Sequence, residues 1–115
     1  MQYNIKGEVM QVLNVVLEEG ETIYSEAGAM AWMSENIQLD AYMHGGIAQG
    51  IGRMFTGESL FLVKYSSIGG AGASSFASSF PGKILDLDIS KSSLICQKDS
   101  FLAAEESVDL KSVFG

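Results

Sequence analysis

His44 and Cys96 are the residues best suited to acid–base or nucleophilic chemistry, and the chain holds one histidine and one cysteine. A serine or cysteine nucleophile needs a base beside it, so any triad would have to use His44. The serine motif Gly57-Glu58-Ser59 is not a nucleophile elbow, because position 61 is Phe61 instead of glycine. A metal centre needs about three protein ligands, which one histidine cannot supply. We therefore predict that the chain is not an enzyme and has no catalytic or metal-binding residues.

Two other features match functional motifs only in part. Gly50-Ile51-Gly52 begins like a dinucleotide-binding loop, but the third glycine would fall at position 55, which is phenylalanine. The acidic pairs Glu18-Glu19 and Glu105-Glu106 lie in expected turns, where carboxylates stay solvated. We predict no cofactor.

The balance of charges limits the classes of partner. The sequence has 14 acidic and 7 basic residues, a net charge of −7, and the basic residues form no cluster. Nucleic acids and anionic membranes are bound by clustered lysine or arginine, so we predict neither as a partner. No apolar run approaches the ~20 residues of a membrane-spanning helix, so we expect no integral membrane segment. One cysteine cannot form an internal disulfide, so we expect a cytoplasmic protein with Cys96 buried.

Short apolar runs and alternating patterns predict β-strands along most of the chain. The expected strands cover residues 10–17, 23–24, 30–33, 37–40, 85–89 and 108–110. Residues 69–79 are rich in Gly, Ala and Ser, and Phe76 among them favours a tight strand pair over a flexible linker. With turn signals every ~8–12 residues, the pattern predicts an all-β fold in a single domain over residues 1–115. The architectures that fit are an antiparallel β-sandwich and a double-stranded β-helix.

An internal repeat relates residues 12–40 to residues 84–111. An offset of 72 residues aligns apolar positions of the two units, such as Leu17 with Ile89. Both units follow the same order of strand, polar turn and strand, although the register is imperfect toward the end. Duplicated β units that stack into one barrel or sandwich would explain this pattern.

Residues 45–57 break the strand pattern with five glycines. Within them, four apolar residues are spaced as on one face of a helix, which predicts a short helix or loop at about 46–56. We take this face as the candidate contact surface between chains: Ile47, Ile51, Met54 and Phe55. A candidate ligand cavity is expected around three aromatic residues: Trp32, Tyr42 and Phe61. Outside that hypothesis, Trp32 is expected in the core, because methionines flank it on a strand.

Several stretches, taken in order, resemble one known family. They are Glu26-Ala27-Gly28-Ala29-Met30, Gly45–Arg53 with Gly57-Glu58-Ser59-Leu60-Phe61, Ser79-Phe80-Pro81-Gly82, and Leu94-Ile95-Cys96-Gln97-Lys98 with Phe101-Leu102-Ala103-Ala104-Glu105. Together they resemble the N-terminal part of the altered-inheritance-of-mitochondria protein 24 family over nearly the whole chain. The resemblance implies antiparallel β-sheets built from repeats, as in the tryptophan RNA-binding attenuator protein, and carries over no catalytic residue and no RNA function.

Typical members of that family continue beyond position 115, so we expect either a naturally short member or a fragment. Sheet surface that later repeats would cover is then open, and open apolar edges tend to be paired. The sequence thus predicts a structural or interaction module that assembles into a homo-oligomer of two or three copies. The alternative is a small-ligand-binding β-barrel domain with its cavity near Trp32.

Overall fold

The computed structural model describes residues 1–42, 62–96 and 100–110, and the regular elements within these ranges are eight β-strands. In chain order they are β1 (Gln2–Lys6), β2 (Val12–Leu17), β3 (Thr22–Glu26), β4 (Met30–Met33), β5 (Ile37–Tyr42), β6 (Leu62–Ser67), β7 (Gly72–Ala77) and β8 (Ala103–Glu105). The predicted helix or loop at about 46–56 lies outside the described residues.

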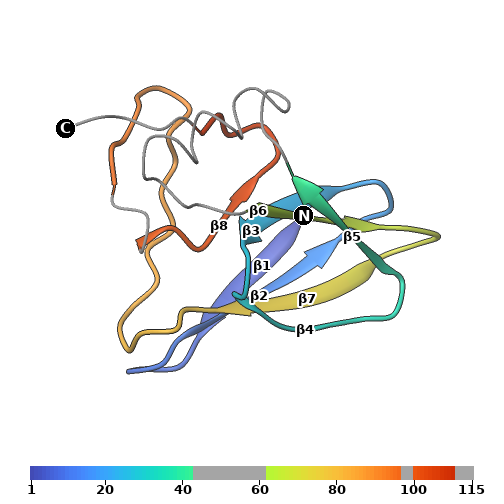
Figure 1. Ribbon diagram of the computed structural model, residues 1–115, viewed down its shortest axis with the longest axis horizontal. Helices are drawn as coiled ribbons and strands as arrows, with labels where there is room; N and C mark the ends of the chain where they lie inside the picture. Colours follow the sequence, from blue (N-terminus) through green and yellow to red (C-terminus); the bar gives the residue numbers. More distant parts are fainter. Residues whose placement is uncertain (43–61, 97–99, 111–115) are drawn as a thin grey trace.

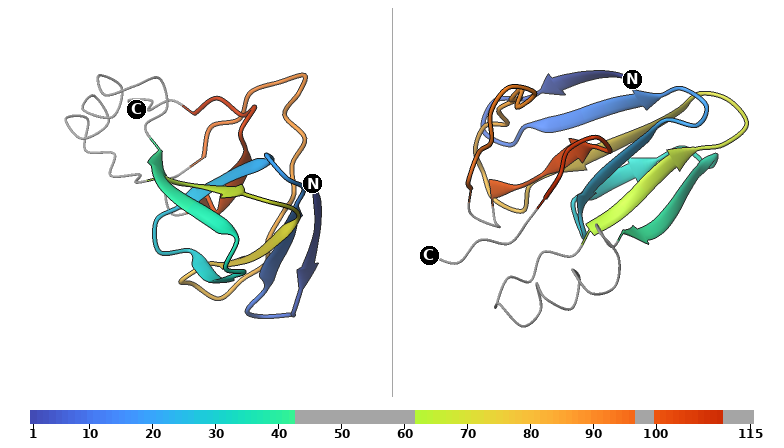
Figure 2. Two further views of the ribbon diagram at one scale, coloured as in Figure 1. Left: turned by 90° about the vertical axis from the view of Figure 1, so that its right-hand side faces the viewer. Right: turned by 90° about the horizontal axis from the view of Figure 1, so that it is seen from above.

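The strands form two antiparallel sheets of four strands each. One sheet has the order β1-β2-β7-β4, and the other has the order β5-β6-β3-β8. The sheets lie face to face as the two layers of a sandwich (Figure 1 and Figure 2). The predicted all-β antiparallel sandwich is therefore confirmed.

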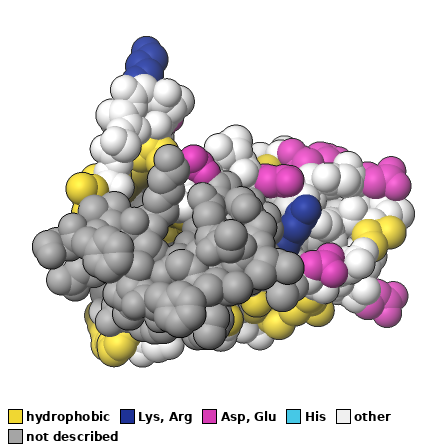
Figure 3. All heavy atoms as spheres, turned by 45° about the horizontal axis from the view of Figure 1, so that its top comes forward, with side chains coloured by type: hydrophobic (Ala, Val, Ile, Leu, Met, Phe, Trp, Pro, Cys, Tyr) yellow, Lys and Arg dark blue, Asp and Glu magenta, His cyan; other side chains and the backbone are white. Residues whose placement is uncertain are grey.

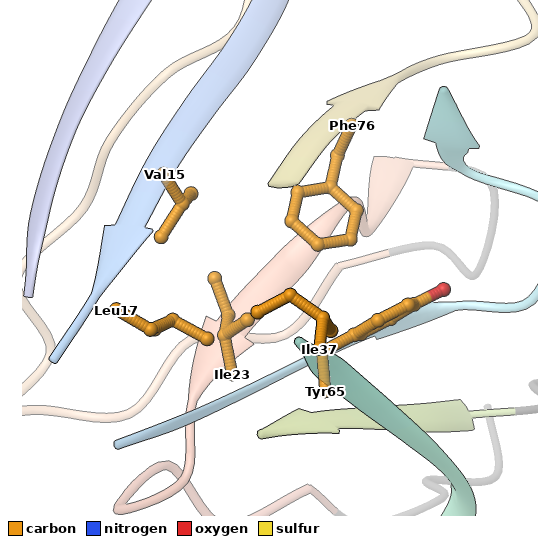
Figure 4. Packing of buried hydrophobic residues seen from close by; sticks show 6 residues of the cluster. All are labelled: Val15, Leu17, Ile23, Ile37, Tyr65 and Phe76. Atoms are coloured by element: carbon orange, nitrogen blue, oxygen red, sulfur yellow. The ribbon is translucent and has the colours of Figure 1, made fainter. Parts of the chain in front are cut away.

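The core lies between the sheets, because alternate residues of each strand point inward. In β2, Val15 and Leu17 are at most 1% exposed, whereas Val16 between them is 42% exposed. Figure 4 shows the buried cluster to which both sheets contribute: Val15, Leu17, Ile23, Ile37, Tyr65 and Phe76. The rings of Tyr65 and Phe76 meet edge to face with their centroids 5.1 Å apart, an arrangement that aromatic pairs prefer.

Small residues in β7 allow the two sheets to approach closely. A Cβ atom added to Gly72 of β7 would lie 2.6 Å from Cδ1 of Ile37, which belongs to β5 in the other sheet. Carbon atoms do not approach to that distance, so a side chain at position 72 would require the Ile37 side chain to move aside, and glycine avoids this. The expectation of a tight strand pair within residues 69–79 is confirmed by β7 and its pairing with β2 and β4.

The segment between β7 and β8 departs most from the sequence-based expectation. Residues 85–89 alternate like a half-buried strand, yet they form no strand and run outside the two sheets (orange in Figure 1). Residues 108–110 form no strand either. Alternation produces a strand only where a neighbouring strand offers backbone partners, and residues 85–89 have none in the described chain. The repeat at an offset of 72 residues stays a prediction.

Three strands formed that the sequence pattern did not mark: β1, β6 and the three-residue β8. β1 lies at the edge of its sheet and pairs along its length with β2. β6 lies inside the other sheet between β5 and β3. Its sequence, LVKYSS, has no strict alternation of apolar and polar residues, which explains why the pattern missed it.

Ser74 and Ser67 are both buried, but they differ in hydrogen bonding. The Ser67 hydroxyl donates to the carbonyl oxygen of Gly70, whereas the Ser74 hydroxyl has no partner in the described part of the chain. A buried hydroxyl without a partner costs about 1–3 kcal/mol. We expect Ser74→Ala to raise the free energy of unfolding by about 1 kcal/mol and the matched Ser67→Ala to lower it by about 1 kcal/mol, measured by denaturant titration. A change of the same sign in both variants would contradict this assignment.

Candidate interaction surface

Among the residues predicted to form sites, Trp32 is the one whose surroundings the structure describes. Tyr42 is the last residue of β5 and its backbone pairs with Leu62, and Phe61 lies outside the described residues. All four predicted interface residues also lie outside them: Ile47, Ile51, Met54 and Phe55. The predicted cavity and the predicted contact surface therefore both stay predictions.

A β-bulge in β4 turns Trp32 toward solvent. The pairing of β4 with β7 shifts its register between Met30 and Trp32. An extra residue in one strand changes the direction in which nearby side chains point. Met30 and Met33 pack against the core, whereas Trp32 is 51% exposed. The expectation that Trp32 belongs to the core is therefore wrong, because the sequence does not mark the bulge.

The segment between β7 and β8 concentrates exposed apolar side chains. We define the apolar strip as the five large apolar side chains of this segment that are more than half exposed: Phe80, Leu85, Leu87, Leu94 and Ile95. Leu85 and Ile95 reach 77% and 78% exposure. Burying one such side chain contributes about 1.5–3 kcal/mol, so five of them in water leave a considerable driving force for association.

The segment that carries the strip has equal numbers of positive and negative side chains, although the chain as a whole is acidic. Residues 80–96 contain two lysines and two aspartates, Lys83, Lys91, Asp86 and Asp88, whereas the whole chain carries −7. Figure 3 shows most of the visible acidic side chains on the right of the view, with hydrophobic side chains exposed there and on the left. Two copies of an acidic protein repel each other least where their charges cancel, so the strip suits contact between copies.

The segment that carries the strip is hydrogen-bonded to β1 and to the loop that follows β1. The Tyr3 hydroxyl donates to Oδ2 of Asp86 at 2.6 Å, and the Ile84 amide donates to Oε1 of Gln11 at 2.6 Å. The Gly82 amide donates to the carbonyl oxygen of Val9, also at 2.6 Å. Within the described ranges, no backbone–backbone hydrogen bond involves residues 85–88. The side chain of Asp86 is thus fixed while the backbone around it remains unpaired.

Cys96 is exposed, which contradicts the prediction of a buried thiol. Its neighbours Leu94 and Ile95 suggested burial, but all three residues follow the segment outside the sandwich. Apolar neighbours in the sequence indicate burial only when the segment that contains them packs into the core. In the described ranges, no group of three or more His, Cys, Asp or Glu side chains is placed to hold a metal ion.

A hollow with a volume of about 160 Å³ lies where β3 and β7 end. Residues at its wall include Glu26, Phe80, Phe101 and Leu102, and Trp32 is not among them. Sites for drug-sized ligands usually measure about 300–1,000 Å³, so this hollow is small for such a ligand. None of the described residues forms a helix long and apolar enough to cross a membrane.

Asp86 raises the pKa of the Tyr3 hydroxyl, because its carboxylate accepts the hydroxyl's hydrogen bond and repels the phenolate. We expect Asp86→Asn to lower the pKa of Tyr3, measured from its ring NMR signals as a function of pH. Because the folded-state pKa is raised, this contact stabilises the fold below the ordinary tyrosine value of 10.0 and is lost as the pH rises through the folded value. Asp88→Asn is the matched control and should leave Tyr3 unchanged. Equal pKa values for Tyr3 in both variants would contradict the contact.

Comparison with known proteins identifies relatives that are longer than this chain. An uncharacterised protein of Streptococcus pyogenes serotype M6 is 30% identical over 107 residues, which cover 87% of this chain and 43% of the relative. The crystal structure of another Streptococcus pyogenes protein, from a structural genomics consortium, matches with a TM-score of 0.61 at 26% identity. That match covers 78% of this chain and 43% of the other. The chain therefore spans less than half the length of these relatives.

Neither relative carries a name that states a catalytic activity. The family itself is shown by a match over almost the whole sequence. The model of the family described as mitochondrial biogenesis AIM24 matches residues 3–115, and the chain belongs to that family.

Proposed function

We propose that this chain is a non-catalytic interaction module that associates with a second copy of itself through the apolar strip. The exposure of the strip supports this proposal most directly, since each of its five side chains is 56–78% exposed. Protein interfaces are formed around aliphatic and aromatic anchors that become fully buried in the complex. Phe80 and four leucine or isoleucine side chains are anchors of that kind.

A second copy is the partner that the charges favour. Any partner surface that covers the strip must be apolar at its centre, and another strip meets that requirement. Residues 80–96, which carry the strip, have no net charge. Two such segments can therefore meet without the repulsion that other acidic surfaces of the chain would cause. A closed dimer related by a two-fold axis is the commonest arrangement for such a self-complementary contact.

The ligand-binding alternative has less support. The described hollow is small, and it is not lined by Trp32. Trp32 is itself half exposed on β4 and encloses no cavity that the structure describes. A single exposed indole suits a contact with another protein at least as well as a ligand site.

Other parts of the proposal rest on the sequence alone. The residues Ile47, Ile51, Met54 and Phe55 are proposed as a second contact surface, and a trimer is proposed as the alternative to a dimer. A reducing cytoplasm suits an exposed free thiol such as Cys96, because thiols there stay reduced. The net charge of −7 remains the reason to expect no nucleic-acid partner.

Ile95 and Ile68 provide a matched test of the apolar strip. Both isoleucines are exposed, at 78% and 51%, but Ile68 lies in the turn between β6 and β7, away from the strip in sequence. We expect Ile95→Ser to raise the dissociation constant of the oligomer by about tenfold or more, because each copy loses a buried side chain of about 1.5–3 kcal/mol. Ile68→Ser should leave the dissociation constant unchanged. Sedimentation equilibrium measures both, and equal effects in the two variants would contradict association through the strip.

A further inference from the structure

We propose that residues Leu85–Ile89 add as a strand to the free edge of β1 in a second copy of the chain. This inference rests on the proposed function, since it requires that two copies associate. Backbone hydrogen bonds between residues 85–89 of one copy and β1 of the other would then join the two copies.

Residues 85–89 have the sequence of a strand and no strand partner. Three of them, Leu85, Leu87 and Ile89, alternate with Asp86 and Asp88. In the described chain the backbone of residues 85–88 makes no backbone–backbone hydrogen bond, and the carbonyl of Ile89 accepts only a turn contact from Ser92. An extended segment with free amides and carbonyls and one apolar face is suited to adding to the edge of a sheet.

β1 is the sheet edge whose chemistry matches this segment. Each sheet ends in two edge strands, and β5 and β8 carry the acidic residues Asp40 and Glu105. Those carboxylates would stand beside Asp86 or Asp88 of an added strand and repel them. β4 is only four residues long and is interrupted by its bulge. β1 is five residues long and Lys6 is its one charged residue, so an added acidic strand gains an opposite charge there.

The inner face of β1 also leaves apolar surface for the added strand to cover. Tyr3 and Ile5 share the face of β1 that points toward the core side, opposite Val15 and Leu13 of β2. Tyr3 nevertheless remains 50% exposed, because the sandwich is incompletely covered at this edge. The three apolar residues of the added strand would extend that face, and its two aspartates would point outward on the side of Lys6.

The position of the segment in one chain makes a reciprocal exchange possible. Asp86 is bonded to the Tyr3 side chain of the same chain, so residues 85–89 lie close to β1, and the exchange replaces this contact with pairing to β1 of the second copy. In a dimer with a two-fold axis, each copy gives one segment to the other and receives one at its own β1 edge. Such an exchange closes a dimer and leaves neither segment unpaired.

Amide hydrogen exchange followed by NMR tests the pairing directly. We expect alternate amides of residues 85–89, together with the β1 amides that face away from β2, to exchange about tenfold or more slowly above the association midpoint than below it. Gly69 and Gly70, in a turn elsewhere, provide the control and should not change. Protection of residues 85–89 without protection of β1 would overturn the proposal, since the segment would then pair elsewhere.

Proline variants separate backbone pairing from the apolar contact. Neighbouring amides of a strand point to opposite sides, so either residue 87 or residue 88 donates to the partner. We compare Leu87→Pro with Leu87→Ala, and Asp88→Pro with Asp88→Ala. At one of the two positions, proline should raise the dissociation constant about tenfold or more beyond alanine, because each of two symmetric contacts loses a hydrogen bond.

The fold of the monomer gives an independent check on these variants, because residues 85–88 make no backbone–backbone bonds in the described chain. Proline and alanine variants should therefore unfold at the same denaturant concentration when measured as monomers. Equal dissociation constants for proline and alanine at both positions would overturn strand addition and leave association through the strip intact. A protein that stays monomeric at all concentrations would overturn both.

Discussion

The packing of the two sheets against one shared core is the constraint on which the rest of the structure depends. Val15, Leu17 and Phe76 come from one sheet, and Ile23, Ile37 and Tyr65 come from the other. Within this core Tyr65 and Phe76 meet edge to face, and the remaining core side chains fill the layer around them. The compact core thus formed has no described place for the apolar residues of the strip.

The strip is exposed because the segment that carries it lies outside both sheets of the described chain. Each sheet has four strands, and β8, with three residues, is the shortest of them. At the edge strand β1, Tyr3 is half exposed and its hydroxyl donates a hydrogen bond to Asp86. Apolar residues that the chain does not bury within itself favour burial in an assembly. In the proposed dimer, assembly would follow from the same packing that defines the fold.

The sequence predicted the fold class well because alternation and β-branched residues report on burial in a sheet. The strands now seen as β2 to β5 were expected within a few residues of their observed bounds, as was the tight strand at β7. β6 was missed because a strand in the middle of a sheet does not have to alternate. Residues 85–89 alternate clearly and still form no strand, because pairing depends on a neighbour that local sequence cannot specify.

Exposure of the candidate interaction surface was harder to predict than the fold, for a similar reason. Trp32 lies between methionines in an apolar run, and only the register shift against β7 shows that it points to solvent. Cys96, Leu94 and Ile95 looked buried in sequence and are exposed because their segment lies outside the sandwich. Exposure at these positions depends on contacts between distant strands. The local sequence alone therefore does not distinguish the exposed strip from a buried strand.

In the proposed dimer, the described sandwich is completed by a second copy of the chain. The mass in solution can be measured by light scattering behind a sizing column across a wide dilution series. We expect a mass of two chains, about twice 12.3 kDa, that falls toward one chain on dilution. A mass of one chain at every concentration would contradict it.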